Sequence, residues 1–221
     1  GVRLVGSEMC IRDRVHSDNK GLVLPPKAAT NKVVLLPMYF KGKEDIVNKQ
    51  MAKLEPSLKK YGVIVDDAKK ENTGFKISKW EIQGIPIQIE VGPRDIQNGV
   101  VTFNIRDLDE KFEVKLEDIE STVELELEKM HKRLYDNAQK KMDNVTIEVS
   151  NFEDFKSEIE NKKRCLVPWA ESKESEDKIK EETGAKSSCK PFKFENKSLD
   201  DVKCFYSGEP ATCWVYFCKS Y

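Results

Sequence analysis

GFKISKWEIQGIPIQIEVGPRD, residues 74–95, is the stretch of sequence that decides the fold. Its first ten residues are typical of a short helix that carries Phe75 and Trp80. IPIQIEV, residues 85–91, alternates between apolar and polar side chains, which predicts a strand that ends at Gly92. The stretch therefore predicts a helix followed directly by a strand.

The residues on either side extend this pattern into a sheet. KVVLLPM, residues 32–38, is a short apolar run that predicts a strand buried on both faces. A helical pattern covers residues 44–61, in which we expect Pro56 to cause a kink or a break, and GVIVDD, residues 62–67, predicts a second strand. Strand, helix and strand in succession favour a sheet with parallel pairs, and GVVTFNI, residues 99–105, predicts a further strand after a turn.

The pattern changes at Leu116. Apolar residues then recur at steps of three and four, which predicts one long packing helix through residue 145 with Glu and Lys on its other face. Residues 146–163 return to a strand followed by a helix, and LVPW, residues 166–169, predicts another strand. Short strand-like runs continue to the end, so residues 146–221 are predicted to form a second unit.

Composition limits the class of protein. The chain has 221 residues, of which 38% are hydrophobic and 35% charged, and this suits one or two globular domains. A net charge of −1 gives no overall attraction to nucleic acid, so any RNA contact needs a local basic surface. No apolar run approaches the roughly 20 residues of a membrane helix, and we expect no membrane partner. Six cysteines are too few for a disulfide scaffold, which leaves metal binding or burial as reduced thiols.

Residues 1–14, GVRLVGSEMCIRDR, are unlike the rest of the chain. They resemble a translated sequencing adapter, and we expect a non-native leader here, with native sequence from Val15 onward. A disordered native N-terminus is the alternative. No function is assigned to Arg3, Cys10 or Arg14.

Four stretches in order resemble one family. These are VHSDNKGLVLPPKAA at 15–29, the stretch at 74–95, IKEETGAKSSCKPF at 179–192 and WVYFCKSY at 214–221. Together they resemble the archaeal- and eukaryotic-type prolyl-tRNA synthetases from Val15 to the last residue.

The resemblance implies a division into domains. Residues 15–31 would be the end of the catalytic-core region, and residues 32–115 an α/β anticodon-binding domain, a mixed sheet flanked by helices. Residues 116–145 would be a long connecting helix. Residues 146–221 would form a small α+β domain that resembles a zinc-binding domain.

It also implies an activity for the parent protein. Members of the family are class II ligases that attach proline to tRNA(Pro), using ATP with Mg in a catalytic core that would lie upstream of these residues. None of the catalytic motifs lies in this chain, so we expect no catalytic residue here and no activity from the chain alone. The expected partners are the tRNA(Pro) anticodon stem-loop and the missing core, in a cytoplasmic homodimer. A stand-alone RNA-binding or scaffolding module without aminoacylation activity is the alternative.

Three residues correspond to the family's anticodon-reading positions. The family reads the two guanines of the proline anticodon with a glutamate, an arginine and a further basic residue; here these are Glu81, Gln88 and Arg94. Gln88 replaces the arginine and so loses a charge. Because Gln88 and Glu90 share one face of an alternating strand, we expect position 88 to point at RNA if the family geometry holds.

The family's zinc ligands fall on four positions in the C-terminal residues, Ala170, Ser175, Cys204 and Ser207. Only Cys204 retains a thiol, and structural zinc takes four sulfur or nitrogen donors. We therefore expect no zinc, with the cysteines buried and reduced. A relocated site is the alternative, built from Cys165, Cys189, Cys204 and Cys213.

Overall fold

The computed structural model describes residues 12–68, 71–108, 110–195 and 197–219. Residues 1–11, which include Arg3 and Cys10, lie outside the described residues; Arg12 to Val15 are helical. The chain divides into two units, the first ending at Tyr135 and the second beginning at Asp136. Each unit has its own sheet and its own apolar core.

The first unit is built on a five-stranded mixed sheet with the strand order β4-β3-β5-β6-β7. β3 pairs in parallel with β4 and β5, while the β5–β6 and β6–β7 pairs are antiparallel. The strands are β3 (Val33–Pro37), β4 (Val63–Val65), β5 (Ile87–Val91), β6 (Val100–Ile105) and β7 (Lys111–Lys115). The predicted α/β fold class and the four predicted strands are confirmed. β7 was missed, because only Val114 of its five residues is fully buried.

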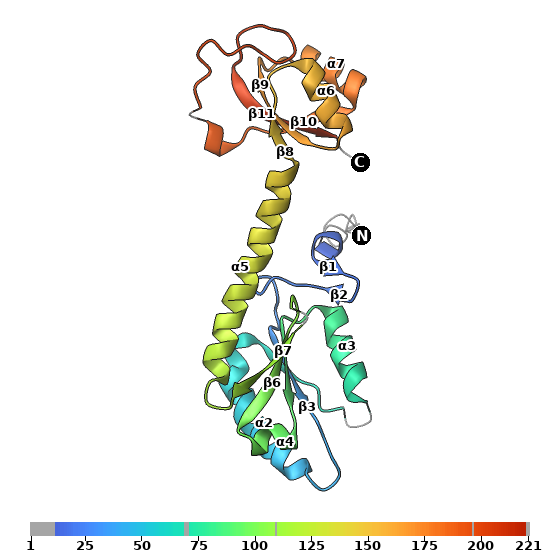
Figure 1. The fold of residues 1–221 in the computed structure, drawn as a ribbon, viewed down its shortest axis with the longest axis vertical. Coiled ribbons are helices and arrows are strands. Elements are labelled where there is room, and N and C mark those ends of the chain that lie inside the picture. Colours follow the sequence, from blue (N-terminus) through green and yellow to red (C-terminus); the bar gives the residue numbers. More distant parts are fainter. Residues whose placement is uncertain (1–11, 69–70, 109, 196, 220–221) are drawn as a thin grey trace, which may run out of the picture. The chain divides into compact units, whose positions relative to one another are not determined.

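Helices cover both faces of this sheet (Figure 1). They are α2 (Glu44–Leu58), the 3₁₀ helix η1 (Lys59–Tyr61), α3 (Thr73–Gln83), α4 (Pro93–Gln97) and α5 (Ile119–Val145). α5 begins three residues later than the predicted Leu116. The expected break at Pro56 does not occur; α2 continues for two further residues before it tightens into η1.

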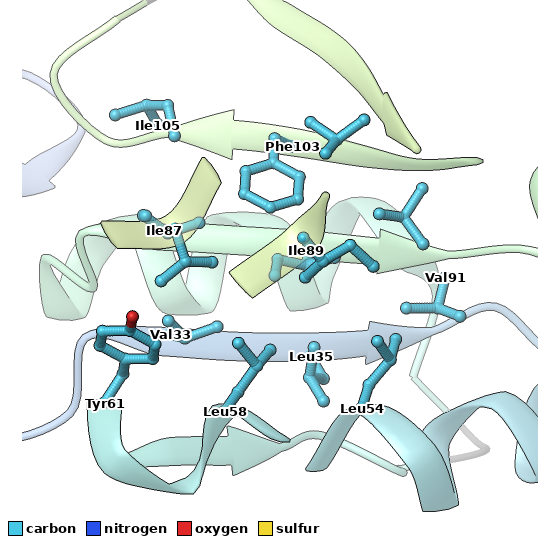
Figure 2. Packing of buried hydrophobic residues seen from close by; sticks show 14 of the residues in the cluster. Val33, Leu35, Leu54, Leu58, Tyr61, Ile87, Ile89, Val91, Phe103 and Ile105 are labelled. Atoms are coloured by element: carbon cyan, nitrogen blue, oxygen red, sulfur yellow. The ribbon is translucent and has the colours of Figure 1, made fainter. Parts of the chain in front are cut away.

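The larger core lies between the sheet and α2, α4 and α5. Val33 and Leu35 of β3 and Ile87 and Ile89 of β5 are fully buried there, as Figure 2 shows from close by. Leu54 and Leu58 of α2 pack against them. The other face of the sheet has a smaller core, in which Val34 and Leu36 pack with Trp80 of α3. Alternation along the strands thus sends odd-numbered and even-numbered residues to different layers.

α5 is covered along only part of its length. Ile119, Val123, Leu127 and Met130 are buried in the first core. The apolar residues that recur later along the helix are more exposed to solvent; Met142, for example, is 44% exposed. The sequence pattern therefore overestimated the packing of the second half of the helix.

The second unit is a four-stranded sheet with the order β10-β11-β9-β8. Its elements are β8 (Thr146–Glu148), α6 (Phe152–Glu160), β9 (Arg164–Trp169), α7 (Lys173–Thr183), β10 (Ala185–Cys189), the 3₁₀ helix η2 (Phe192–Phe194) and β11 (Cys213–Lys219). Phe155, Phe205 and Phe217 form an aromatic centre with ring centroids 4.8–5.8 Å apart. The predicted α+β class of this unit is confirmed.

Candidate nucleic-acid interface

A buried carboxylate fixes α3, the helix that carries Glu81, to the sheet. Asp66 follows β4, and its Oδ2 accepts hydrogen bonds from Trp80 Nε1 at 2.7 Å and from Lys79 Nζ at 3.0 Å. The main-chain oxygen of Asp66 accepts from Lys76 Nζ at 2.9 Å. The side chains of Asp66 and Lys76 are each 3% exposed. Burial raises the pKa of the Asp66 carboxyl, but the hydrogen bonds from Trp80 and Lys79 outweigh it, so the pKa lies below its ordinary value.

An arginine holds the C-terminal end of the same helix. Arg106 follows β6; its Nε donates to the main-chain oxygen of Glu81 at 3.1 Å, and its Nη1 and Nη2 donate to Asp18 at 2.9 and 2.6 Å. These bonds to the Arg106 guanidinium lower the pKa of Asp18 to about 2. Asp18 belongs to a short hairpin, β1 (Ser17–Asp18) with β2 (Gly21–Leu22).

The hairpin lies directly on the end of α3. A Cβ added to Gly21 would come within 2.4 Å of the Ile82 Cα, and the φ of Gly21 is +139°, so only glycine fits here. The last turn of α3 is therefore held from two sides. The Glu81 carboxylate itself makes no hydrogen bond to a described residue and is half-buried. It is free to accept hydrogen bonds from a ligand.

Gln88 does not point at the surface, which corrects the expectation drawn from its alternation with Glu90. Its side chain is 1% exposed, because α3 covers this position of β5. Gln88 Nε2 donates to the main-chain oxygen of Ile77 at 3.3 Å, and Gln88 Oε1 has no partner among the described residues. A glutamine at this position is too short to emerge from beneath the helix.

The buried and unpartnered Oε1 gives a test of this placement. We expect Gln88→Leu to raise the free energy of unfolding by about 1 kcal/mol, because it removes an unsatisfied acceptor at similar volume. An exposed position would tolerate arginine. Because position 88 is buried, we expect Gln88→Arg to destabilise the unit by burying a charge. Urea unfolding of the three proteins measures both effects. An unchanged stability for both variants would contradict the buried placement.

Arg94 is not brought together with Glu81. Glu81 precedes β5 and Arg94 follows it, so the two are separated by the length of that strand, about 13 Å or more. Moreover, α4, which carries Arg94, packs against α2 and β6, whereas α3 packs against the opposite face. The Arg94 side chain is exposed.

Lys111 is a partly exposed basic residue on the sheet face that α3 covers, and the sequence pattern revealed neither this residue nor its strand. The register places Gln88, Asn104 and Lys111 in one row across β5, β6 and β7. The row begins at Gln88 beneath α3 and ends at Lys111 on β7, the edge strand. β7 lies two strand spacings, about 10 Å, from β5. Lys111 is 43% exposed and forms an ion pair with Glu90. The alternating charges of KFEVK, residues 111–115, are the signal that could have revealed it.

The candidate surface consists of Glu81 on α3 together with Glu90, Thr102 and Lys111 on the adjoining sheet. Thr102 and Glu90 are cross-strand partners and both are partly exposed. The surface offers carboxylate acceptors and one ammonium donor beside an open sheet face. It holds no nucleophile paired with a base, so binding rather than catalysis is the chemistry that it supports.

In the second unit, three of the four degenerate zinc positions come together. The Cys204 thiol is buried, which opposes ionisation, yet hydrogen bonds from the Ser207 hydroxyl and from the amides of Ser207, Tyr206 and Ala170 hold its pKa below the ordinary value. Ser175 serves another purpose: its Oγ accepts from Trp169 Nε1 at 2.9 Å and donates to the Ser172 oxygen at 2.8 Å.

The other cysteines do not assemble a replacement site among the described residues, where no group of three or more His, Cys, Asp or Glu side chains is placed to hold a metal ion. Cys165 is buried with Cys218 nearby, and burial raises the pKa of the Cys165 thiol to about 12. Cys189 is exposed on β10.

The absence of zinc stays a prediction. Elemental analysis of protein purified without chelator is expected to find far less than one zinc per chain, since one thiol supplies too few donors. A stoichiometric content that falls on Cys204→Ala would contradict this expectation.

Comparison with known proteins identifies the family to which this chain is related. The model of the anticodon-binding domain matches residues 32–126, and the model described as the C-terminal domain of prolyl-tRNA synthetase matches residues 152–221. The "Proline--tRNA ligase" of Chlorobium luteolum is 38% identical over 99% of this chain. The chain belongs to the prolyl-tRNA synthetase family.

Two further relatives agree. "Proline--tRNA ligase 2" of Clostridioides difficile is 36% identical over 93% of the chain. A crystal structure of the prolyl-tRNA synthetase from Cryptosporidium parvum, complexed with halofuginone and AMPPNP, matches 95% of the chain with a TM-score of 0.84 and 32% identity. The chain spans 46% of the Chlorobium protein, 42% of the Clostridioides protein and 44% of the Cryptosporidium chain, so it covers about half the length of these synthetases. None of the described helices is long and apolar enough to cross a membrane.

Proposed function

We propose that this chain is the anticodon-reading and C-terminal part of a cytoplasmic proline–tRNA ligase, which attaches proline to tRNA(Pro) at the expense of ATP. The observation that carries the proposal is the candidate surface of Glu81, Glu90, Thr102 and Lys111, which lies within the residues that match the anticodon-binding domain. ATP and Mg would be bound by a catalytic core that this chain does not contain. The proposed partners are the anticodon stem-loop and that core, in a homodimeric enzyme.

The chemistry of the surface suits guanine. A carboxylate accepts hydrogen bonds from N1–H and from the N2 amino group of an unpaired guanine, and an ammonium group donates to O6, N7 or a phosphate. Glu81 has a carboxylate without a partner among the described residues, on a helix end that Arg106 holds in place. Lys111 would supply the donor, by exchanging Glu90 for RNA. Gln88 would support α3 from below rather than touch RNA.

Selective binding of the proline anticodon tests the proposal. We expect this chain to bind a tRNA(Pro) anticodon stem-loop about 10- to 100-fold more tightly than the same stem-loop with an adenine in place of one of the two guanines, since a mismatched base costs about 1–3 kcal/mol. Fluorescence anisotropy with the two labelled RNAs at one salt concentration measures the ratio. Equal affinity for both would favour the alternative, a module that binds RNA without reading the anticodon or acts as a scaffold.

A further inference from the structure

A basic cavity of about 530 Å³ lies in the second unit, where the end of α6, the start of β9 and the end of β11 meet. Four cationic side chains line it: Lys162, Lys163, Arg164 and Lys219. Glu160 is the one acidic side chain in the described lining, and Val145 and Ile159 add apolar surface.

The four cations have no carboxylate partner among the described residues. Lys163 Nζ donates to the main-chain oxygen of Asn144 at 2.8 Å, and Arg164 Nε and Nη2 both donate to Thr146 Oγ1, at 3.1 and 2.8 Å. These acceptors are neutral. Elsewhere in the same unit lysines are paired with carboxylates, for example Lys197 with Glu148. In the described lining, four cationic side chains therefore stand against one carboxylate, that of Glu160, and this excess of positive charge favours an anionic ligand.

The Arg164 guanidinium is held in a defined position, and Lys162 lies at a turn with an unusual backbone conformation. The Arg164 guanidinium lies 4.1 Å from the centroid of the Tyr216 ring, and its bonds to Thr146 leave Nη1 free to donate. Lys162 has a φ of +61°, a conformation that suits glycine or asparagine better than lysine.

We propose that this cavity binds phosphate groups of the tRNA backbone outside the anticodon loop. A planar guanidinium with free N–H groups and several ammonium groups is the combination that binds phosphate oxygens. An RNA backbone is chosen over a small phosphate compound because the proposed function already supplies a polyanionic partner. The inference rests on that function for its ligand, and it gives the second unit a contact with RNA of its own.

Two substitutions remove charge from the cavity with little risk to folding. Lys162→Gly relieves the positive φ and is expected to leave the unfolding temperature unchanged or higher. Lys219→Gln removes a charge from an exposed strand end. The control is Lys180→Gln, which removes one exposed lysine charge, half the change in the double variant, from a position in α7 outside the described lining of the cavity.

Binding is measured for full-length tRNA(Pro) transcript and for its anticodon stem-loop at several salt concentrations. The double variant, which combines Lys162→Gly and Lys219→Gln, is expected to bind the transcript about 10-fold more weakly than the wild type. The slope of log K against log salt should fall by about 2, which is about one for each phosphate that is no longer neutralised. Its affinity for the stem-loop and the behaviour of Lys180→Gln should stay at the wild-type level. Inorganic pyrophosphate, tested as a competitor, should displace the transcript less well from the double variant than from the wild type.

Three results would overturn the proposal. The double variant and Lys180→Gln could bind the transcript alike, although the stem-loop selectivity holds; the anticodon function would then stand without this site. Both RNAs could lose affinity equally in the double variant, which would place the effect in the anticodon contact. Pyrophosphate could bind the wild type but not the double variant while binding of the transcript is unaffected, which would assign the cavity to a small phosphate ligand. If instead the stem-loop shows no guanine preference but the variants still weaken the transcript, the cavity is supported and the anticodon proposal fails.

Discussion

Asp66→Ala is expected to lower the free energy of unfolding of the first unit by about 3–5 kcal/mol, the cost of removing one partner from a buried charged cluster. The substitution would leave the Lys76 ammonium, 3% exposed, without its nearest carboxylate and the Trp80 indole N–H without its acceptor. Both groups lie on the face of α3 that packs on the sheet, so the helix that carries Glu81 would lose its main polar attachment. Urea unfolding followed by tryptophan fluorescence measures the change.

The same carboxylate predicts a dependence on pH. Its pKa is lower in the folded protein than the ordinary value of 3.8, so its contribution to stability is fully present above that value. The contribution is lost as the pH falls through the lower folded value. The difference in stability between wild type and Asp66→Ala should therefore be constant near neutral pH and shrink in acid.

Glu71→Ala is the matched control. Glu71 is the other carboxylate near Lys79, at 3.5 Å, but both side chains are about one-third exposed. A partly exposed pair contributes about 1 kcal/mol or less, and we expect a reduction in stability within that range. Equal reductions for the Asp66 and Glu71 variants would show that α3 is not held by the buried cluster.

The sequence predicted the layers of the fold more accurately than its edges. The apolar runs that become β3 and β5 are buried on both faces, which makes them conspicuous. β7 was missed because its side chains alternate between the core and water at the edge of the sheet, and its charges resemble a loop. The length of α5 was predicted well, but its periodicity does not show that packing fades after Met130.

The candidate site was predicted in part, for a similar reason. Glu81 lies in the last turn of α3 with a half-buried side chain, and its role in binding RNA stays a prediction. Alternation alone cannot show that α3 covers Gln88 and leaves Glu90 partly open, because a helix crosses a sheet at a position that the strand sequence does not encode. Strand pairing brings Lys111, to which the sequence analysis gave no role, to the sheet face that α3 covers, 30 positions after Glu81. The packing of α4 against α2 and β6 places Arg94, 13 positions after Glu81, on the other face.

Glu81→Ala is expected to weaken binding of the tRNA(Pro) anticodon stem-loop by about 1–3 kcal/mol, because the guanine edge loses its acceptor while the helix stays in place. Arg106 and Gly84 bind the main-chain oxygen of Glu81, so truncation of the side chain should leave α3 intact. Lys111→Gln should weaken binding and reduce the salt dependence by about one unit of slope. Arg94→Ala should have a smaller effect than either, because Arg94 lies on the other face. An Arg94 effect equal to that of Glu81 would show that the bound RNA reaches both faces.

The most direct measurement is a double-mutant cycle that combines Glu81→Ala with replacement of each anticodon guanine by inosine, which lacks only the N2 amino group. If the Glu81 carboxylate accepts a hydrogen bond from that amino group, inosine weakens binding to the wild type but not to Glu81→Ala, with a coupling energy of about 1–2 kcal/mol at one of the two guanines. Additive effects at both guanines would mean that Glu81 does not read the anticodon.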